Sequence, residues 1–202
     1  HHPLDPLTIT EVNKVQKVIK SFFKNYVYAV HSLVLEDPDK SVVLTWKRGD
    51  ELPVRKASVM ARAKGRNYLL TVHVESGEVE EHDVSGLSGF PLVTLEDMQK
   101  VLYTPLKSAK FNRTVEERGV DLNDVVCLPF SPGWFGKAEE GRRLVKLECF
   151  NTQGTANFYM RPIEGIIIIT DLDTNEVVEI IDTGKHIPIP KAANTDYRLS
   201  AQ

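Results

Sequence analysis

The sequence predicts an α+β fold made of two small domains, each an antiparallel sheet covered by one or two helices. A helical pattern followed by a series of strand patterns occurs twice, and the turn sequence Leu87–Pro91 separates the two series. Each series is about 90 to 100 residues long, which is an ordinary size for a domain. We therefore expect domains at 1–88 and 89–190, followed by a linker at 191–202.

The first series opens with an amphipathic helix over Thr8–Lys24. Thr8 and Glu11 have the spacing of a capping box, which satisfies backbone N–H groups where a helix begins. We expect this helix to cover the sheet of its own domain, with a partner-binding or membrane helix as the alternative. Its apolar residues recur at intervals of three and four, as on one face of a helix: Ile9, Val12, Val15, Val18, Ile19, Phe22 and Phe23.

Five strand patterns complete the first domain. The third alternates most clearly, with Ala57 and Val59 directed inward and Lys56 and Ser58 outward. A hairpin turn at Lys64–Asn67 joins it to the fourth. One helix on such an antiparallel meander is an α+β arrangement. The expected strands are Tyr26–Leu35, Ser41–Lys47, Val54–Ala63, Tyr68–Glu75 and Glu78–Val84.

The second domain repeats the order of helix and then sheet. Thr94 is placed to cap a helix, and Thr104–Pro105 ends that helix and opens a third. Gly119 is placed to close the third helix. Two cysteine-bearing strands follow, and then a hairpin of Gly165–Asp171 and Glu176–Asp182. The tail from Gly184 has no periodicity, which is typical of a linker.

The two cysteines of the chain, Cys127 and Cys149, lie on apolar strand patterns that flank the aromatic turn Phe130–Gly136. Alternation places each cysteine on the apolar face of its strand, so both are directed toward a common core. A disulfide between them would stabilise the domain by about 3 kcal/mol in the chain-entropy model. It would also imply passage through an oxidising compartment. Two buried free thiols are the alternative.

The composition is that of a globular protein, with 202 residues, 42% of them hydrophobic and 26% charged. The net charge of -3 argues against a nucleic-acid partner, which requires a concentrated basic face. No apolar run approaches the length of about 18 residues that a membrane-spanning helix needs. We therefore expect neither a nucleic acid nor a membrane as a partner.

Residues that could carry chemistry are scattered. The histidines His31, His73, His82 and His186 lack the close spacing of metal ligands, so no metal site is expected. Asp171–Asn175 resembles the start of a calcium loop, but Glu176 stands where that loop needs glycine, and we interpret it as a hairpin turn. Asn112 begins a glycosylation sequon within a predicted helix. No nucleophile elbow or phosphate-binding loop is present, so the residues alone indicate a non-catalytic fragment.

Several motifs nevertheless resemble one family over the whole chain. The opening His2–Thr8 and the turn Phe130–Gly136 are similar to segments of the plant copper-containing amine oxidases. Arg161–Gly165, Ile181–Gly184 and Asn194–Leu199 resemble that family too. The resemblance implies two cystatin-like N-terminal domains, called N2 and N3, of a large homodimer. It also implies a β-sandwich that carries copper on three histidines and a topaquinone formed from a tyrosine.

The resemblance implies that such a parent oxidises primary amines to aldehydes and releases ammonia and hydrogen peroxide. This chain departs from the catalytic pattern, because the cofactor tyrosine is expected in Asn-Tyr-Asp or Asn-Tyr-Glu. Here Tyr26 precedes Val27 and Tyr68 precedes Leu69, and the paired copper histidines are absent. We therefore expect an inactive fragment with no catalytic residue and no cofactor of its own, whose partner is the sandwich of the parent.

The resemblance also assigns roles in the parent. Pro129, Phe130 and Tyr159 match positions at the rim of the substrate channel, with ordinary sheet packing as the alternative for the two aromatic residues. Plant members carry a disulfide in the second domain, which supports the bridge between Cys127 and Cys149. We expect secretion to the apoplast, with a peroxisomal location as the alternative. Two other hypotheses are a free-standing binding or storage-type protein derived from such an enzyme, and a small enzyme or metal binder.

Overall fold

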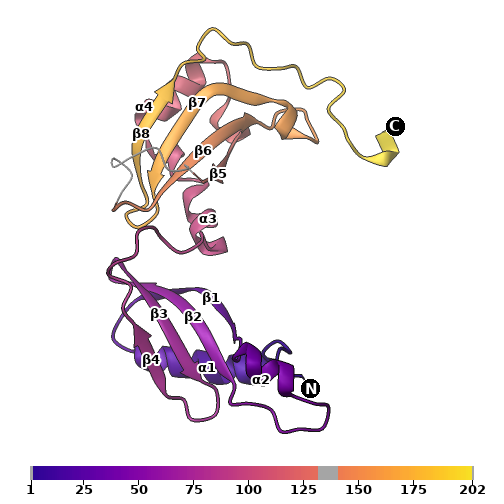
Figure 1. Cartoon of the computed structure of the whole chain (residues 1–202). Helices are drawn as coiled ribbons and strands as arrows, with labels where there is room; N and C mark the ends of the chain where they lie inside the picture. Colours follow the sequence, from indigo (N-terminus) through magenta and orange to yellow (C-terminus); the bar gives the residue numbers. More distant parts are fainter. Residues whose placement is uncertain (1, 132–140, 202) are drawn as a thin grey trace. The chain divides into compact units, whose positions relative to one another are not determined.

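The computed structural model describes residues 2–131 and 141–201. The chain forms two compact units, His1–Leu92 and Val93–Gln202 (Figure 1). Each unit holds one four-stranded antiparallel sheet, which we call sheet A in unit 1 and sheet B in unit 2. The predicted α+β fold of two helix-and-sheet modules is confirmed. The units divide after Leu92, whereas the sequence suggested a division after residue 88.

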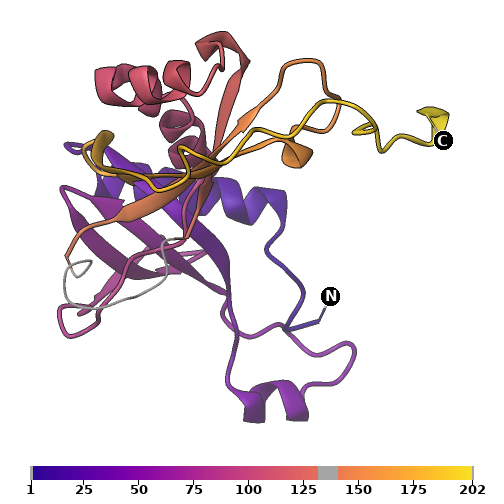
Figure 2. The ribbon, with the colours of Figure 1, turned by 90° about the horizontal axis from the view of Figure 1, so that it is seen from above.

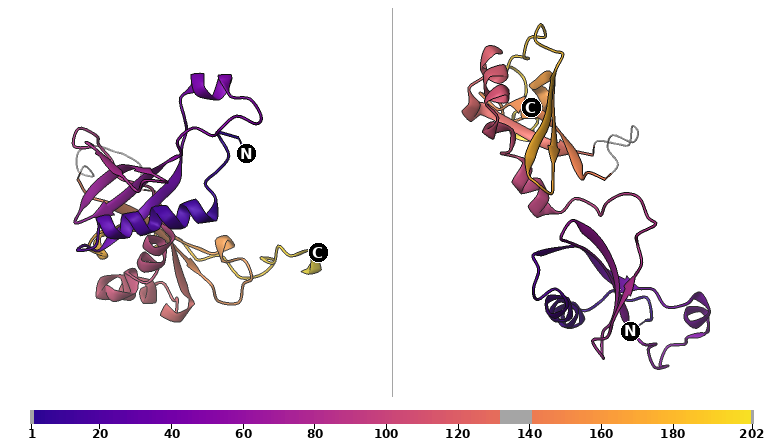
Figure 3. Two further views of the ribbon diagram at one scale, coloured as in Figure 1. Left: turned by 90° about the horizontal axis from the view of Figure 1, so that it is seen from below. Right: turned by 90° about the vertical axis from the view of Figure 1, so that its left-hand side faces the viewer.

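Unit 1 is a helix followed by a four-stranded meander. Helix α1 lies across one face of sheet A (Figure 3). It begins with the predicted capping box, in which the Thr8 hydroxyl accepts a hydrogen bond from the Glu11 N–H and the Glu11 carboxylate accepts one from the Thr8 N–H. The elements are α1 (Ile9–Phe22), β1 (Tyr28–Glu36), α2 (Lys40–Thr45), β2 (Lys56–Ala63), β3 (Arg66–His73) and β4 (Val79–His82).

The core of unit 1 lies between α1 and sheet A. Val15, Ile19 and Phe23 are fully buried against the inward residues of β2 and β3. Three of the four inward positions on β2 are alanines, and their small side chains let the helix lie close to the sheet. Phe23 stacks on Tyr28, with ring centroids 4.9 Å apart, and closes the end of this core. The inward residues are Ala57, Val59, Ala61, Ala63, Leu70 and Val72.

The predicted strand at Ser41–Lys47 is wrong. This segment forms the short helix α2, which lies in the connection between β1 and β2 and away from the sheet (Figure 2). The Thr45 hydroxyl donates to the Ser41 carbonyl, one turn back along the helix. None of its residues is buried, and Leu44 is 74% exposed. β-branched residues favour strands only where a neighbouring strand offers a surface to pack on, and this segment has none among the described residues.

Unit 2 places its helices on one face of sheet B. Val101 of α3 and Phe111 and Val115 of α4 form the core with the inward residues of the sheet. The single helix expected after Thr104 is divided into a 3-10 turn and α4. The elements are α3 (Leu95–Val101), η1 (Pro105–Lys107), α4 (Ala109–Glu117), η2 (Leu122–Asp124), β5 (Val125–Phe130), β6 (Leu144–Asn151), η4 (Phe158–Met160), β7 (Pro162–Asp171), β8 (Glu176–Asp182) and η5 (Leu199–Ala201).

Each unit ties the start of its first helix to the residue before its second strand. In unit 1, Arg55 donates to Glu11 with an N–O distance of 2.6 Å. In unit 2, Arg143 donates to Asp97 at 2.5 Å, and Asp97 is the third residue of α3, the same position that Glu11 holds in α1. Both pairs are largely buried. Each pair connects the N-terminus of its helix to the sheet, and the helix dipole favours a negative charge at that terminus.

Burial and hydrogen bonding act in opposite directions on the pKa values of these two carboxyls. Burial acts to raise the pKa of Glu11, but hydrogen bonds from Arg55 and Thr8 outweigh it and lower the pKa to about 2. Burial likewise acts to raise the pKa of Asp97, and the hydrogen bonds from Arg143 and Thr94 outweigh it, so this pKa is also lowered. Both side chains therefore stay ionised through the neutral and mildly acidic range.

Among the described residues, no helix is long and apolar enough to cross a membrane. The longest helix, α1, has 14 residues and covers a sheet of its own unit.

Candidate functional site

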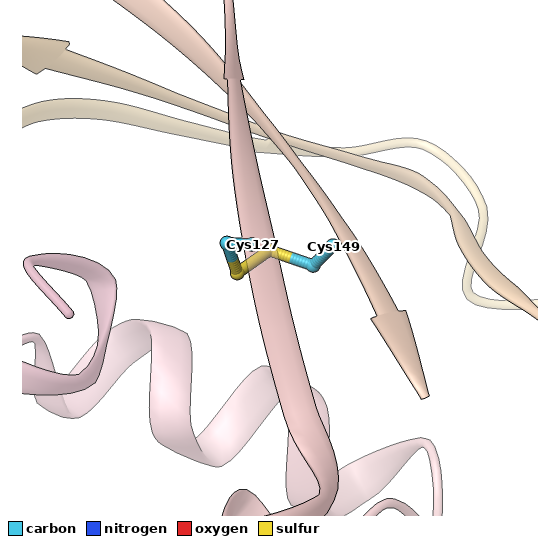
Figure 4. Close-up of a disulfide and its surroundings, with 2 residues drawn as sticks. All are labelled: Cys127 and Cys149. Carbon is cyan, nitrogen blue, oxygen red and sulfur yellow. A yellow bond between two sulfur atoms is a disulfide. The ribbon is translucent and has the colours of Figure 1, made fainter. Parts of the chain in front are cut away.

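The structure contains a disulfide between Cys127 on β5 and Cys149 on β6, as Figure 4 shows. The two residues lie directly opposite each other on neighbouring antiparallel strands, with Cα atoms 4.0 Å apart. Each cysteine is only 2% exposed and belongs to the core of unit 2. Sheet A has no equivalent, because the chain has two cysteines and both lie in unit 2.

The sequence-predicted rim residues do not come together. Pro129 and Phe130 are consecutive on β5, so their side chains lie on opposite faces of sheet B. Pro129 is half-buried, whereas Phe130 is 44% exposed. Tyr159 belongs to η4, beyond the other end of β5.

Tyr159 is part of an aromatic cluster with Phe150 and Phe158. Its ring centroid lies 5.6 Å from that of Phe150 and 4.5 Å from that of Phe158, yet the residue is 60% exposed. Phe150 is paired with Val126, which precedes Phe130 by a rise of about 13 Å along the strand. Phe130 and Tyr159 therefore lie near opposite ends of β5.

Phe130 lies on the face of sheet B opposite the core, which we call the open face of sheet B. The register places Leu128, Glu148, Ile167 and Ile181 in one row across the four strands. The next row is Phe130, Lys146, Ile169 and Glu179. Five of these eight side chains are apolar, and none of the five belongs to the core cluster of the described residues. The four aliphatic ones are half-buried, since neighbouring strands partly shield them.

The corresponding surface of unit 1, the open face of sheet A, is mostly polar. Thr71 donates to Glu36 at 2.6 Å and contacts His82 Nε2 at 2.8 Å. His73 Nε2 lies 2.6 Å from the Glu80 carboxylate. The hydrogen bond from His73 and the charge of Lys56 hold the pKa of Glu80 below its ordinary value. Val34, Met60 and Leu69 are interleaved with these polar groups.

The described residues contain no group of three or more His, Cys, Asp or Glu side chains that could hold a metal ion. His73 and His82 take part in the pairs above, and His31 Nδ1 lies 2.6 Å from the Leu92 carbonyl. The segment Asp171–Asn175 forms the predicted hairpin turn between β7 and β8. The Asp171 carboxylate accepts backbone hydrogen bonds from Asp173 and Thr174 within the turn.

Asn112 lies in α4, and its side-chain amide donates to the Leu106 carbonyl at 3.0 Å. Thr114, the third residue of the sequon, is 8% exposed. Glycosylation at Asn112 stays a prediction.

The tail is held against unit 2, which sequence reasoning missed. Arg118 donates to the Ile187 carbonyl at 3.1 Å, and Arg161 donates to the Pro190 carbonyl at 2.8 Å. The Thr155 hydroxyl donates a hydrogen bond to the Thr195 hydroxyl, with an O–O distance of 2.6 Å, and Thr195 is 7% exposed. The segment has no helix or strand between Asp182 and Leu199, so no periodic pattern could have revealed this contact (Figure 2). The arginines that hold it are distant in sequence.

Two glycines also fix the start of the tail. Gly165 on β7 and Gly184 lie in direct backbone contact, and a Cβ on Gly184 would stand 2.0 Å from the Glu164 carbonyl oxygen. A Cβ on Gly165 would stand 2.4 Å from the Gly184 nitrogen, and its φ of +83° disfavours other residues as well. No side chain fits at either position.

Two family models match the chain in sequence order. The model described as copper amine oxidase, N2 domain, matches residues 2–84, and the N3 domain model matches residues 96–200. The chain belongs to the copper amine oxidase family. The two matched ranges correspond to the two units of the structure.

Plant relatives cover the whole chain. It is 44% identical over 205 residues to the copper-containing amine oxidase gamma 1 of Arabidopsis thaliana, covering 100% of this chain and 29% of that protein. It is 34% identical to the primary amine oxidase of Pisum sativum, covering 100% of this chain and 30% of that protein. The chain thus spans less than a third of the length of these curated relatives.

A solved structure shows the same fold. The copper-containing benzylamine oxidase of Hansenula polymorpha superposes with a TM-score of 0.75 at 20% sequence identity. The match covers 90% of this chain and 30% of that protein. The N-terminal region of an amine oxidase is therefore the architecture of this chain.

Proposed function

We propose that this chain is the non-catalytic N2 and N3 domain pair of a copper-containing primary amine oxidase. The full-length parent would deaminate primary amines oxidatively to an aldehyde, ammonia and hydrogen peroxide. One observation carries the proposal: the N2 and N3 models match in order over nearly the whole chain, which spans only 29% of its Arabidopsis relative.

Copper and topaquinone would belong to the part of the parent that this chain does not include. The residues described do not fit either group. They offer no cluster of three metal-ligating side chains, and no described Tyr stands in Asn-Tyr-Asp or Asn-Tyr-Glu. Tyr68 packs its ring against Phe22 and Phe23. We therefore propose that this chain is inactive alone.

We propose further that unit 2 borders the substrate channel of the parent through Phe130 and Tyr159. Both aromatic rings are exposed although large apolar side chains usually lie inside a domain. At a channel mouth, such rings would contact the alkyl part of an amine and help to exclude water. Ordinary packing explains the contact of Tyr159 with Phe150, but it does not explain the exposure of Phe130.

Substitution in the parent would test this border. We expect Phe130→Ala and Tyr159→Ala to raise KM for long-chain amines more than for short ones, because the rim contacts only the distal part of the substrate. Val178→Ala, an exposed valine on β8, is the matched control. Unchanged KM values in both rim variants would assign Phe130 and Tyr159 to packing alone.

The main experiment follows the transcript beyond residue 202 and compares two proteins. We expect the open reading frame to continue past residue 202 and to encode the sequence Asn-Tyr-Asp or Asn-Tyr-Glu. The full-length product should release peroxide on addition of a primary amine, and the 202-residue chain should not. A frame that ends at residue 202 would favour a free-standing binding or storage-type protein. Stoichiometric copper or turnover in the 202-residue chain would favour a small enzyme.

Secretion to the apoplast is part of the proposal, because a disulfide forms and persists in oxidising compartments. One relative, the Arabidopsis amine oxidase alpha 2, is described as peroxisomal, so the peroxisome is the alternative. Localisation of the tagged full-length protein decides between them. Its elution volume on a sizing column tests the homodimer that we propose for the parent.

A further inference from the structure

The two open sheet faces differ in what they present to water. The open face of sheet A carries hydrogen-bonded polar groups, including Glu36, Thr71, His73 and Glu80. The open face of sheet B carries Leu128, Phe130, Ile167, Ile169 and Ile181 in two adjoining rows. The three isoleucines adjoin one another on β7 and β8, whereas Lys146 and Glu148 on β6 lie between them and the two β5 residues. Apolar surface of this kind, flanked by polar residues, marks an interaction site more often than a free surface does.

Helices of unit 2 do not account for this surface. Val101 of α3 and Phe111 and Val115 of α4 are buried in the core on the other face of the sheet. Of the two central strands, β7 shows the pattern of a strand covered on both sides, because its run Ile166–Ile169 directs alternate apolar residues to opposite faces. The other, β6, directs Lys146 and Glu148 to the open face. A strand that is apolar on both faces is usual where both faces are buried.

The tail indicates what could reach this face. Arg118, Arg161 and Thr155 hold the chain against unit 2 as far as Thr195. Any polypeptide that follows residue 202 would therefore start from unit 2, not from unit 1. Tethering over a few residues raises the effective concentration of such a segment to about the millimolar range. The curated relatives have more than two thirds of their length outside the part that this chain matches.

We propose that the open face of sheet B packs against an apolar surface of the polypeptide that follows residue 202 in the full-length protein. This inference rests on the proposed function and names the surface through which unit 2 joins the catalytic part. The open face of sheet A stays in water. The contact is intramolecular, so the tether compensates for the small number of apolar side chains that each strand offers.

Thiol labelling compares the two faces directly. Ile167→Cys places a thiol at the centre of the open face of sheet B, and Val34→Cys places one on the open face of sheet A, where Val34 is 55% exposed. Each variant is made in the 202-residue chain and in the full-length protein, and its maleimide labelling rate is compared between the two. Ile181→Cys on β8 is the second variant if Ile167→Cys does not fold.

We expect the rate for Ile167→Cys to fall by at least about tenfold in the full-length protein, because a thiol beneath a packed surface reacts only when the contact opens. The rate for Val34→Cys should be the same in both. An equal rate for Ile167→Cys in the two proteins overturns the proposal. Slow labelling of Ile167→Cys in the 202-residue chain that quickens on dilution also overturns it, because a second copy would then cover the face.

The proposed function has its own readout in the same preparation. Amine-dependent peroxide release by the full-length protein tests the function whatever the labelling shows. Release without protection of Ile167→Cys would keep the function and reject the docking surface. A transcript whose frame ends at residue 202 would remove the occupant and reject both.

Discussion

Units 1 and 2 have the same arrangement of helix and sheet, but the open faces of their sheets differ. Both have four antiparallel strands in sequence order and a capped first helix, and both tie that helix to an arginine immediately before the second strand. Arg55 and Arg143 are therefore equivalent residues, as are Glu11 and Asp97. The arrangement repeats although no sequence repeat is visible.

The two units differ in their cross-strand links and in the side chains that each sheet directs inward and outward. Sheet B carries a disulfide and an apolar open face, whereas sheet A carries small inward alanines and a polar open face. Because side chains alternate along a strand, the outward residues can change without altering the core. The inward residues therefore set the fold of each unit, and the outward residues set what each sheet can contact.

The largest effect expected in either unit comes from the contact between Gly165 and Gly184. We expect Gly184→Ala to lower the free energy of unfolding of unit 2 by at least about 3 kcal/mol, because the new Cβ would overlap a backbone carbonyl that cannot move alone. Unit 1 should be unaffected. Native-state hydrogen exchange measures the strands of each unit separately.

Gly86→Ala in unit 1 is the matched control, since a Cβ there meets nothing within 4 Å. Its effect should stay within about 0.5 kcal/mol. If Gly184→Ala is equally mild, the tail does not lie as described.

Removal of the disulfide should be the next largest effect. We expect Cys127→Ala with Cys149→Ala to lower the free energy of unfolding of unit 2 by about 3 kcal/mol, because the bridge closes a loop of 22 residues in the unfolded chain. Reduction of the native chain should act the same way and leave the urea transition of unit 1 unchanged. A shift of both transitions would show that the units unfold together.

The paired carboxylates should give smaller, matched effects. We expect Glu11→Gln to destabilise unit 1, and Asp97→Asn to destabilise unit 2, by about 2 kcal/mol each, because each leaves a largely buried arginine without the negative charge that its hydrogen bond now reaches. Urea unfolding at pH 7 measures both. An effect of either substitution on the other unit would contradict the division of the chain.

The same pairs predict a pH dependence with a definite sign. Glu11 has a pKa of about 2 in the folded protein, against an ordinary value of 4.5, so its contribution to stability is complete above about pH 4.5. The contribution should fall as the pH drops from 4.5 toward 2. Glu11→Gln should flatten this part of the unit 1 profile, and an unchanged slope would assign the acid sensitivity to other groups.

The smallest effect is expected on the open face of sheet A. Glu80 is paired with His73 and Lys56 but is exposed to water, which screens the pair. We therefore expect Glu80→Gln to leave the unfolding of unit 1 unchanged within the error of the measurement. A clear loss would mean that the polar face of sheet A contributes to folding and is not merely compatible with water.

Sequence reasoning succeeded where the determining interactions are local. The capping box of Thr8 and Glu11 spans three residues, and the alternation along β2 lies within one strand, so both could be predicted. The strand pairing of the two cysteines followed from their matching faces. The failure at Ser41–Lys47 had the opposite cause, because its strand propensity is overridden by the absence of a neighbouring strand.

Long-range contacts of the candidate site could not be predicted. Arg118 and Arg161 reach the tail across 69 and 29 residues, and neither has a distinctive sequence neighbourhood. The separation of Phe130 from Tyr159 depends on the position of η4 beyond the end of β5. The family resemblance assigned both residues to one rim, and only the strand register shows that they lie near opposite ends of β5.

The cross-strand disulfide has a mechanical consequence. If the chain were pulled from its two ends, unit 1 could be drawn out completely, whereas the segment from Cys127 to Cys149, with a sequence separation of 22, could not. That segment would withhold about 75 Å of contour length from the extended chain. Under tension, unit 2 would therefore lengthen less per residue than unit 1, and a reducing agent would abolish the difference.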